Sequence, residues 1–138
     1  MASGIYNRLK ANLMNKVVDL EADTIKIALM DTNHSFTATH NNWSEVSANE
    51  IADDSGNGYT AGGETLANLA VTQAATTKWD NTVDIAWSSA TFTAYHAVIY
   101  DTTASNDLIC SLDFSGAKTV SSGTFTIQFD AAGIITLT

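Results

Sequence analysis

The chain has 138 residues, which is enough for one domain whose hydrophobic core needs no disulfide or metal to hold it. Hydrophobic residues make up 45%, which excludes a disordered chain, and no apolar run reaches the length of a membrane-spanning helix. Fifteen acidic residues against six lysines and arginines give a net charge of −9, the wrong sign for a nucleic-acid-binding surface. We therefore expect a soluble protein without a secretory signal that binds neither nucleic acid nor a membrane.

The first 18 residues differ from the rest in pattern and in charge. Their apolar residues recur at helical spacing: Tyr6, Leu9, Leu13 and Val17. With Ser3 as a capping residue, this pattern predicts a helix of about ten to fourteen residues within residues 3–18. The segment holds Arg8, Lys10 and Lys16 and no acidic residue, whereas residues 19–138 carry a net charge of −12. We expect a helical leader over residues 1–22.

A β pattern begins after the leader and continues to the end of the chain. The run Thr24–Met30 is rich in β-branched residues and predicts the first strand. Further strands are predicted at residues 66–72, 83–87, 92–100, 108–114, 124–129 and 134–137, with turn residues between them. Short strands at this spacing, with no alternating helices, favour an antiparallel β-sandwich or jelly roll. The predicted fold is mainly β, with a single sandwich domain over residues 23–138 after the N-terminal helix.

A long polar excursion separates the first two predicted strands, over residues 31–63. Ser47 and Glu50 have the spacing of a capping box, which predicts a short helix at the centre of the excursion. The oxygen-rich segment Asp53–Gly58 lacks the spacing of a calcium loop, so we interpret it as a turn. We expect a structural loop in which glycines allow a close approach of two segments; its residues are Gly58, Tyr59, Gly62 and Gly63.

The sequence contains no combination of residues that is typical of catalysis. We interpret His34 and His40 as histidines of a surface loop, and His96 as a histidine of the sheet whose hydrogen bonds are satisfied. The single cysteine, Cys110, lies in an apolar stretch and is interpreted as a buried structural thiol. We therefore expect no catalytic residue, no metal site, no cofactor and no enzymatic activity.

Several short segments between residue 58 and the C-terminus form a recognisable succession. They are Gly58-Tyr59-x-x-Gly62-Gly63-x-x-Leu66, Val83-Asp84-Ile85-Ala86-Trp87, Ala94-Tyr95-x-Ala97-Val98-Ile99-Tyr100-Asp101, Leu112-Asp113-Phe114, Gly123-Thr124-Phe125-Thr126-Ile127 and Gly133-Ile134-Ile135-Thr136-Leu137. This succession resembles small virion structural proteins of tailed bacteriophages, over residues 24–138. Capsid decoration (cement) proteins with a jelly roll or related β-sandwich are the best understood of these.

The resemblance implies a structural role on the virion. We expect a capsid decoration protein that is made in the host bacterial cytoplasm, binds the major capsid protein on the outer face of the capsid, and forms homodimers or homotrimers there. A subunit of the tail, neck or fibre is the first alternative. A carbohydrate-binding module is the second, and its stacking residues would be Trp43, Trp79, Trp87 and Tyr59.

The leader is the segment that we expect to contact the capsid or a sister subunit. The expected contact residues are Tyr6, Arg8, Lys10, Leu13 and Lys16. Their positive charge would attract an acidic or carbonyl-rich surface, which would repel the rest of the chain. The alternative is that the apolar residues of the helix dock on the chain's own sandwich as a lid.

Overall fold

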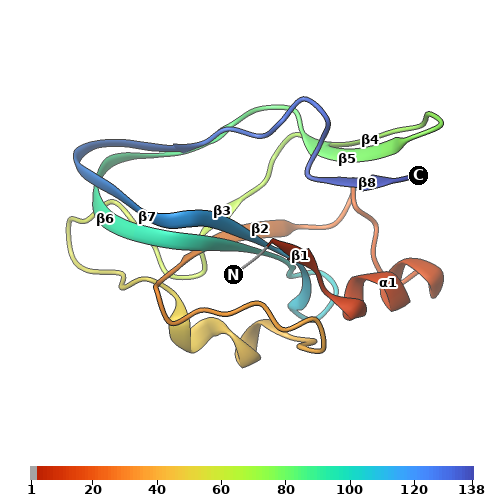
Figure 1. The fold of residues 1–138 in the computed structure, drawn as a ribbon, viewed down its shortest axis with the longest axis horizontal. Helices are drawn as coiled ribbons and strands as arrows, with labels where there is room; N and C mark the ends of the chain where they lie inside the picture. The colour runs from red at the N-terminus through yellow and green to blue at the C-terminus, as the bar shows by residue number, and fades with distance from the viewer. Residues whose placement is uncertain (1–2) are drawn as a thin grey trace.

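The structure is a computed structural model that describes residues 3–138, and its strands form two antiparallel sheets that lie in two layers (Figure 1). The five-stranded sheet has the order β1-β7-β6-β2-β3, where the strands are β1 at Gly4–Ile5, β7 at Asp107–Ile127, β6 at Ile85–Asp101, β2 at Ile25–Met30 and β3 at Glu64–Thr65. The three-stranded sheet has the order β4-β5-β8, where the strands are β4 at Leu69–Thr72, β5 at Thr77–Asn81 and β8 at Ile135–Leu137. One helix, α1, spans Asn7–Met14. The prediction of a mainly β, antiparallel fold with an N-terminal helix is confirmed at this level.

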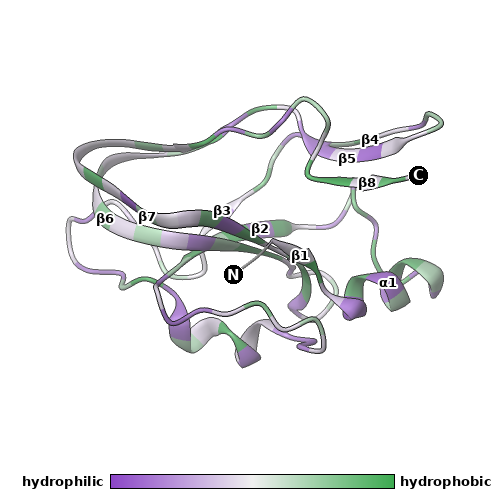
Figure 2. Cartoon of the chain, viewed as in Figure 1, coloured by the Kyte–Doolittle hydropathy of each residue, from purple (hydrophilic) through white to green (hydrophobic). Residues whose placement is uncertain are grey.

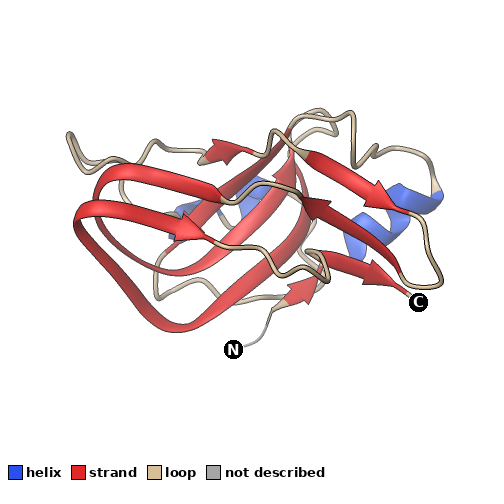
Figure 3. Ribbon diagram, turned by 90° about the horizontal axis from the view of Figure 1, so that it is seen from above, coloured by secondary structure: helices blue, strands red, loops and turns tan. Residues whose placement is uncertain are grey.

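Strands β6 and β7 form a hairpin that is long enough to belong to both layers. They contain 17 and 21 residues, and Figures 1 and 3 show the pair bending back over itself. At the bend, the pairing register shifts on both sides of Ala90, and Ser89 and Ser122 each have a φ of +50°. The prediction of separate strands at 83–87 and 92–100, and at 108–114 and 124–129, was therefore wrong. Ser89 and Ser122, whose φ angles lie in the left-handed region, bend two continuous strands at positions where the sequence predicted loops.

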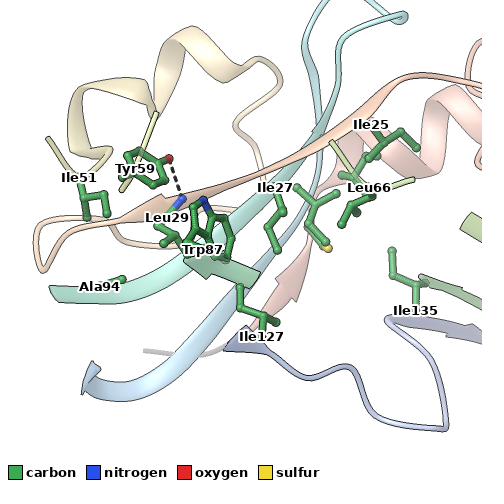
Figure 4. Packing of buried hydrophobic residues seen from close by; sticks show 14 of the residues in the cluster. Ile25, Ile27, Leu29, Ile51, Tyr59, Leu66, Trp87, Ala94, Ile127 and Ile135 are labelled. Carbon is green, nitrogen blue, oxygen red and sulfur yellow. Dashed lines mark hydrogen bonds between the residues drawn. The ribbon is translucent and has the colours of Figure 1, made fainter. Parts of the chain in front are cut away.

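Strand β2 occupies the predicted position and separates two hydrophobic cores. Its odd-numbered residues Ile25, Ile27 and Leu29 belong to the larger core, which lies between the two layers and includes Trp87, Ile127 and Ile135 (Figure 4). Its even-numbered residues Ala28 and Met30 belong to the smaller core on the other face of the sheet. Both faces of β2 are therefore buried, which explains why its sequence is apolar at nearly every position.

The polar excursion covers the smaller core. Val46 points inward, and Trp43 stacks on Tyr100 with the ring centroids 4.5 Å apart. The expected short helix is present only as two 3₁₀ turns, η1 at Trp43–Glu45 and η2 at Ser47–Asn49. No capping box forms, because η2 follows η1 directly and has Val46 in the N-cap position. Instead the Asn42 side chain caps η1 by accepting a hydrogen bond from the Ser44 amide at 3.1 Å.

Helix α1 is shorter than predicted, with eight residues. Gly4 and Ile5 are extended because they pair with Ser111 and Cys110 of β7, so the helix cannot begin before Tyr6. Ser3 does not cap the helix; its hydroxyl accepts a hydrogen bond from the Asp113 amide at 2.9 Å. After Asn15 the chain leaves the helix through Lys16, which has a φ of +57°.

Candidate interaction surfaces

Helix α1 is held on the main sheet by one buried face. The side chains of Tyr6 and Leu9 are buried, and Leu9 belongs to the larger core. The buried Asp107 carboxylate, at the start of β7, accepts hydrogen bonds from Arg8 Nε at 2.7 Å and from Asn12 Nδ2 at 2.8 Å on the same oxygen. The lid and attachment hypotheses are therefore compatible, because docking uses one face of the helix only.

The exposed surface of α1 and of the turn that follows it presents the rest of the residues that were expected to make contacts. Lys10, Leu13 and Lys16 are exposed, and the Arg8 side chain is half-exposed while it binds Asp107. Tyr6 must be removed from the expected contact set, because its ring is fully buried beside Phe36, 5.0 Å away between centroids. Figure 2 shows that hydrophobic residues gather toward the C-terminal end of α1. The sequence could not distinguish Tyr6 from Leu13, because both have the spacing of one helical face.

Replacing Asp107 with alanine is expected to destabilise the fold by about 2 kcal/mol, because it leaves the buried Asn12 amide without its acceptor and releases Arg8. Urea unfolding of the variant measures this loss. Lys10→Ala serves as the control, since Lys10 is exposed and its ammonium group donates a hydrogen bond to the Asn7 side chain at the surface. An Asp107→Ala variant as stable as Lys10→Ala would show that the buried carboxylate does not hold the helix.

An apolar groove lies between α1 and the second sheet. It has a volume of about 350 Å³, and its walls include Leu9 and Leu13 from the helix and Trp79, Ile135 and Leu137 from β5 and β8. Beside it, Met14 is 89% and Val17 is 51% exposed. An apolar surface at this point, bordered by Lys10 and Lys78, is typical of a protein interaction site.

The predicted glycine loop is held against the main sheet by Glu50. Its Oε1 accepts hydrogen bonds from the Tyr59 hydroxyl and from the Gly62 amide, each at 2.6 Å. The Tyr100 hydroxyl donates to the Gly62 carbonyl at 2.6 Å, and burial raises the pKa of Tyr100 to about 12, so it remains a donor at neutral pH. Gly58, Gly62 and Gly63 all have positive φ values. The loop is therefore a structural element, and Glu50 is the residue of this element that the sequence did not identify.

His34 is not the surface histidine that the sequence suggested. It is 1% exposed, its ring lies 5.2 Å from the buried His96 ring, and its Nε2 is 2.9 Å from Ser111 Oγ. Burial, followed by the charge of His96, lowers the pKa of His34 to about 4. The prediction was wrong because the polar excursion folds over the sheet and carries His34 inside.

His96 lies in β6 as predicted, and its hydrogen bonds are partly satisfied. Its Nδ1 donates to the Asp31 carbonyl at 3.4 Å, and its Nε2 lies 3.6 Å from Asp113 Oδ1. His40, in contrast, remains partly exposed in the excursion.

The segment Asp53–Gly58 forms a turn, as expected. Asp53 Oδ2 accepts a hydrogen bond from the Ala61 amide at 3.0 Å, and the Asn57 amide group donates to the Ala52 carbonyl at 2.8 Å. Within residues 3–138, no group of three or more histidine, cysteine, aspartate or glutamate side chains could hold a metal ion. The Asp53 carboxylate and the Asn57 side chain thus hold this turn and the segment that follows it.

Cys110 is buried, and burial raises the pKa of its thiol to about 12, as a structural cysteine requires.

Burial also affects the four aromatic residues considered for sugar stacking. Trp79, Trp87 and Tyr59 are each at most 3% exposed, which leaves Trp43 as the accessible member, and its ring already stacks on Tyr100. Trp79 is fixed inside because its indole donates to the Leu20 carbonyl at 2.8 Å, in a strand, β5, that the sequence did not predict.

None of the helices in the described part of the chain has the length and apolar character needed to cross a membrane. Comparisons with known protein families, with curated proteins and with solved structures found no match to this chain.

Proposed function

We propose that this chain is a non-enzymatic structural protein of a bacteriophage virion, which decorates the outer face of the capsid and stabilises it. The observation that carries this proposal is the exposed surface of α1 and of the turn that follows it. It exposes Lys10, Leu13 and Lys16 next to the apolar groove, on a molecule whose remaining chain is strongly acidic. We take the two-layered arrangement as the β-sandwich that such proteins have.

The chemistry of this face indicates the kind of partner that it fits. Exposed leucine, methionine and valine side chains lose contact with water when a partner covers them, which favours binding. Lysines around them favour a partner that offers carboxylates or carbonyl oxygens. The acidic remainder of the chain would be repelled by such a surface, so the orientation on the capsid is fixed: α1 toward the major capsid protein and the rest toward solvent.

The histidines and carboxylates of the described residues support a structural role over a catalytic one. The buried histidines are packed against one another and against β7, and the Asp107 carboxylate holds the helix. Many identical copies on a lattice would also make weak individual contacts sufficient, because binding at one site raises the local concentration at the next.

Exchanging both lysines of this face for acidic residues, Lys10→Glu together with Lys16→Glu, is expected to weaken capsid binding by at least about tenfold. The measurement is the binding of purified protein to particles that lack it, followed by sedimentation and by a copy count using mass spectrometry. The stability should remain unchanged, since both side chains are exposed. Binding of the unaltered protein should weaken as salt rises.

The control is Lys10→Arg with Lys16→Arg, which keeps the charge and should bind normally. Undiminished binding of the glutamate variant would contradict attachment through α1. Hundreds of copies in each particle support a decoration protein, whereas a few to dozens would indicate a subunit of the tail, neck or fibre. Absence from particles would overturn the proposal.

A further inference from the structure

One long side of the molecule has open strand edges in both layers. In the main sheet, β1 is the edge strand, and it pairs with β7 only at Ser111 and Cys110. Beyond these residues, β7 has β6 on one side and no strand on the other among the residues that the structure describes. In the second sheet, β8 is an edge strand as well. Figure 3 shows β1 and β8 along the same side of the molecule.

A cleft opens between these edges. Its central part has a volume of about 540 Å³ and is walled by Leu112 and Phe114 from the first half of β7 and by Phe125 and Ile127 from the second half. Phe114 and Phe125 face each other with ring centroids 6.2 Å apart, and both are only half-buried. A second hollow of about 420 Å³ shares Ser3 and Leu112 with it and continues toward α1. The larger core is therefore accessible from this side.

The edge of β7 has few of the features that prevent an edge strand from pairing with a strand of another molecule. Residues 114–129 contain one charged residue, Lys118, and no proline. A bulge at Ser115 and Gly116, with φ values of +58° and +123°, protects the first half of the strand. The second half, from Gly123 to Ile127, has no such protection. An exposed, nearly uncharged edge of this kind pairs readily with another strand.

The charge on this side indicates a second copy of the chain as the occupant. The cleft and the second hollow are bordered by two lysines and two aspartates: Lys10, Lys118, Asp113 and Asp130. This side is therefore neutral, while the rest of the chain carries the whole net charge of −9. Two copies that meet through these neutral sides keep their acidic surfaces apart and so avoid the repulsion between them.

Symmetry strengthens this argument. In a two-fold dimer, each lysine of one copy faces a surface of the other copy that contains the aspartates. The two-fold axis also places the edge strand beside the same strand of the other copy, in antiparallel orientation. Lys118 is exposed and makes no ion pair within residues 3–138, so it is available for such a contact. The Phe114 and Phe125 rings would be covered at the same time.

We propose that two copies of this chain associate through the open edge of β7, with a two-fold axis, antiparallel edges and the cleft of Phe114 and Phe125 closed between them. This inference rests on the proposed function and deepens it, because it assigns a surface and a symmetry to the self-association that the resemblance implies. The strand edge and Lys118, which the tests address, lie outside the attachment surface of α1, although Lys10 borders both surfaces.

The charge test uses two single variants with the same change in net charge. Lys118→Glu is expected to weaken self-association by at least about tenfold at low salt, with a smaller loss at high salt. Lys16→Glu, outside the cleft, is expected to leave self-association unchanged while it weakens capsid binding. Sedimentation equilibrium of the full chain gives the dissociation constants. The two proposals fail separately, because each variant affects a different readout.

A cross-linking test locates the contact. Cysteines are introduced one at a time at exposed positions of β7, as Thr119→Cys, Thr124→Cys and Thr126→Cys, and Thr65→Cys on the opposite edge strand β3 is the control. The native Cys110 is buried and should not react. At least one β7 variant should form a disulfide-linked dimer in higher yield than the control.

Three results would overturn the inference. They are a protein that stays monomeric at about 100 µM, cross-linking of the β7 variants no stronger than that of the β3 control, and open-ended oligomers, which indicate head-to-tail contacts.

Discussion

Replacing Gly63 with valine is expected to destabilise the fold by about 4 kcal/mol, as the combined effect of backbone strain and steric overlap. Gly63 has a φ of +75°, which a β-branched residue adopts only with strain. A side chain at this position would also overlap the backbone of Ile27 and Ala28 in β2. Because β2 is central and buried on both faces, it cannot move away, so the loop must detach from the sheet.

Three alanine variants separate strain from overlap. Gly56 has a φ of +82° and no atom near the added carbon, so Gly56→Ala should lose only about 1 kcal/mol. Gly62→Ala should behave in the same way, because the atoms nearest to the added Cβ, Tyr100 Oη and Lys26 Nζ, would lie 3.5 and 3.6 Å from it. Gly63→Ala should lose at least about 2 kcal/mol more than either. Urea unfolding measures all three, and equal losses would show that Gly63 is not held against β2.

Acid is expected to weaken the fold through His34. Its pKa is about 4 in the folded protein and about 6.5 in the unfolded chain, so the unfolded state binds the proton more tightly. The stability due to neutral His34 is fully present above pH 6.5 and is lost as the pH falls toward 4. This loss reaches about 3 kcal/mol at pH 4.

The change of unfolding free energy with pH must be compared between variants, because protonation of Asp101 has the opposite effect on stability. Burial raises the pKa of the Asp101 carboxyl to about 6, so its protonation below this pH stabilises the fold. His34→Gln cannot titrate and keeps a polar group for Ser111. Its loss of unfolding free energy between pH 7 and pH 4 should be about 3 kcal/mol smaller than that of the unaltered protein.

His40→Gln is the matched control, since His40 belongs to the same excursion and is partly exposed. Its charge is only a smaller cause of the lowered pKa of His34, after burial and the charge of His96, so His40→Gln should change the pH dependence far less than His34→Gln does. An unchanged pH dependence in His34→Gln would show that His34 is not buried in its neutral form in solution.

Much of the secondary structure follows from local patterns. Strand β2, the turn before β7 and strand β8 lie where clustered β-branched residues and turn residues predict them. The glycine loop follows too, because closely spaced glycines indicate backbone angles that other residues avoid. The burial of Cys110 was evident from its apolar neighbours. These features depend on residues that are close together in the sequence.

The rest was decided by contacts between distant segments. The helix begins at Asn7 because β7 pairs with Gly4 and Ile5, about a hundred residues away. His34 is buried because the excursion folds over β2 and β6, and β6 and β7 are continuous because the two layers require a bent ribbon. Local propensity cannot encode such contacts, since long-range packing outweighs it. The open edge of β7 is likewise visible only in three dimensions, because the sequence shows a strand but not which strands lie beside it.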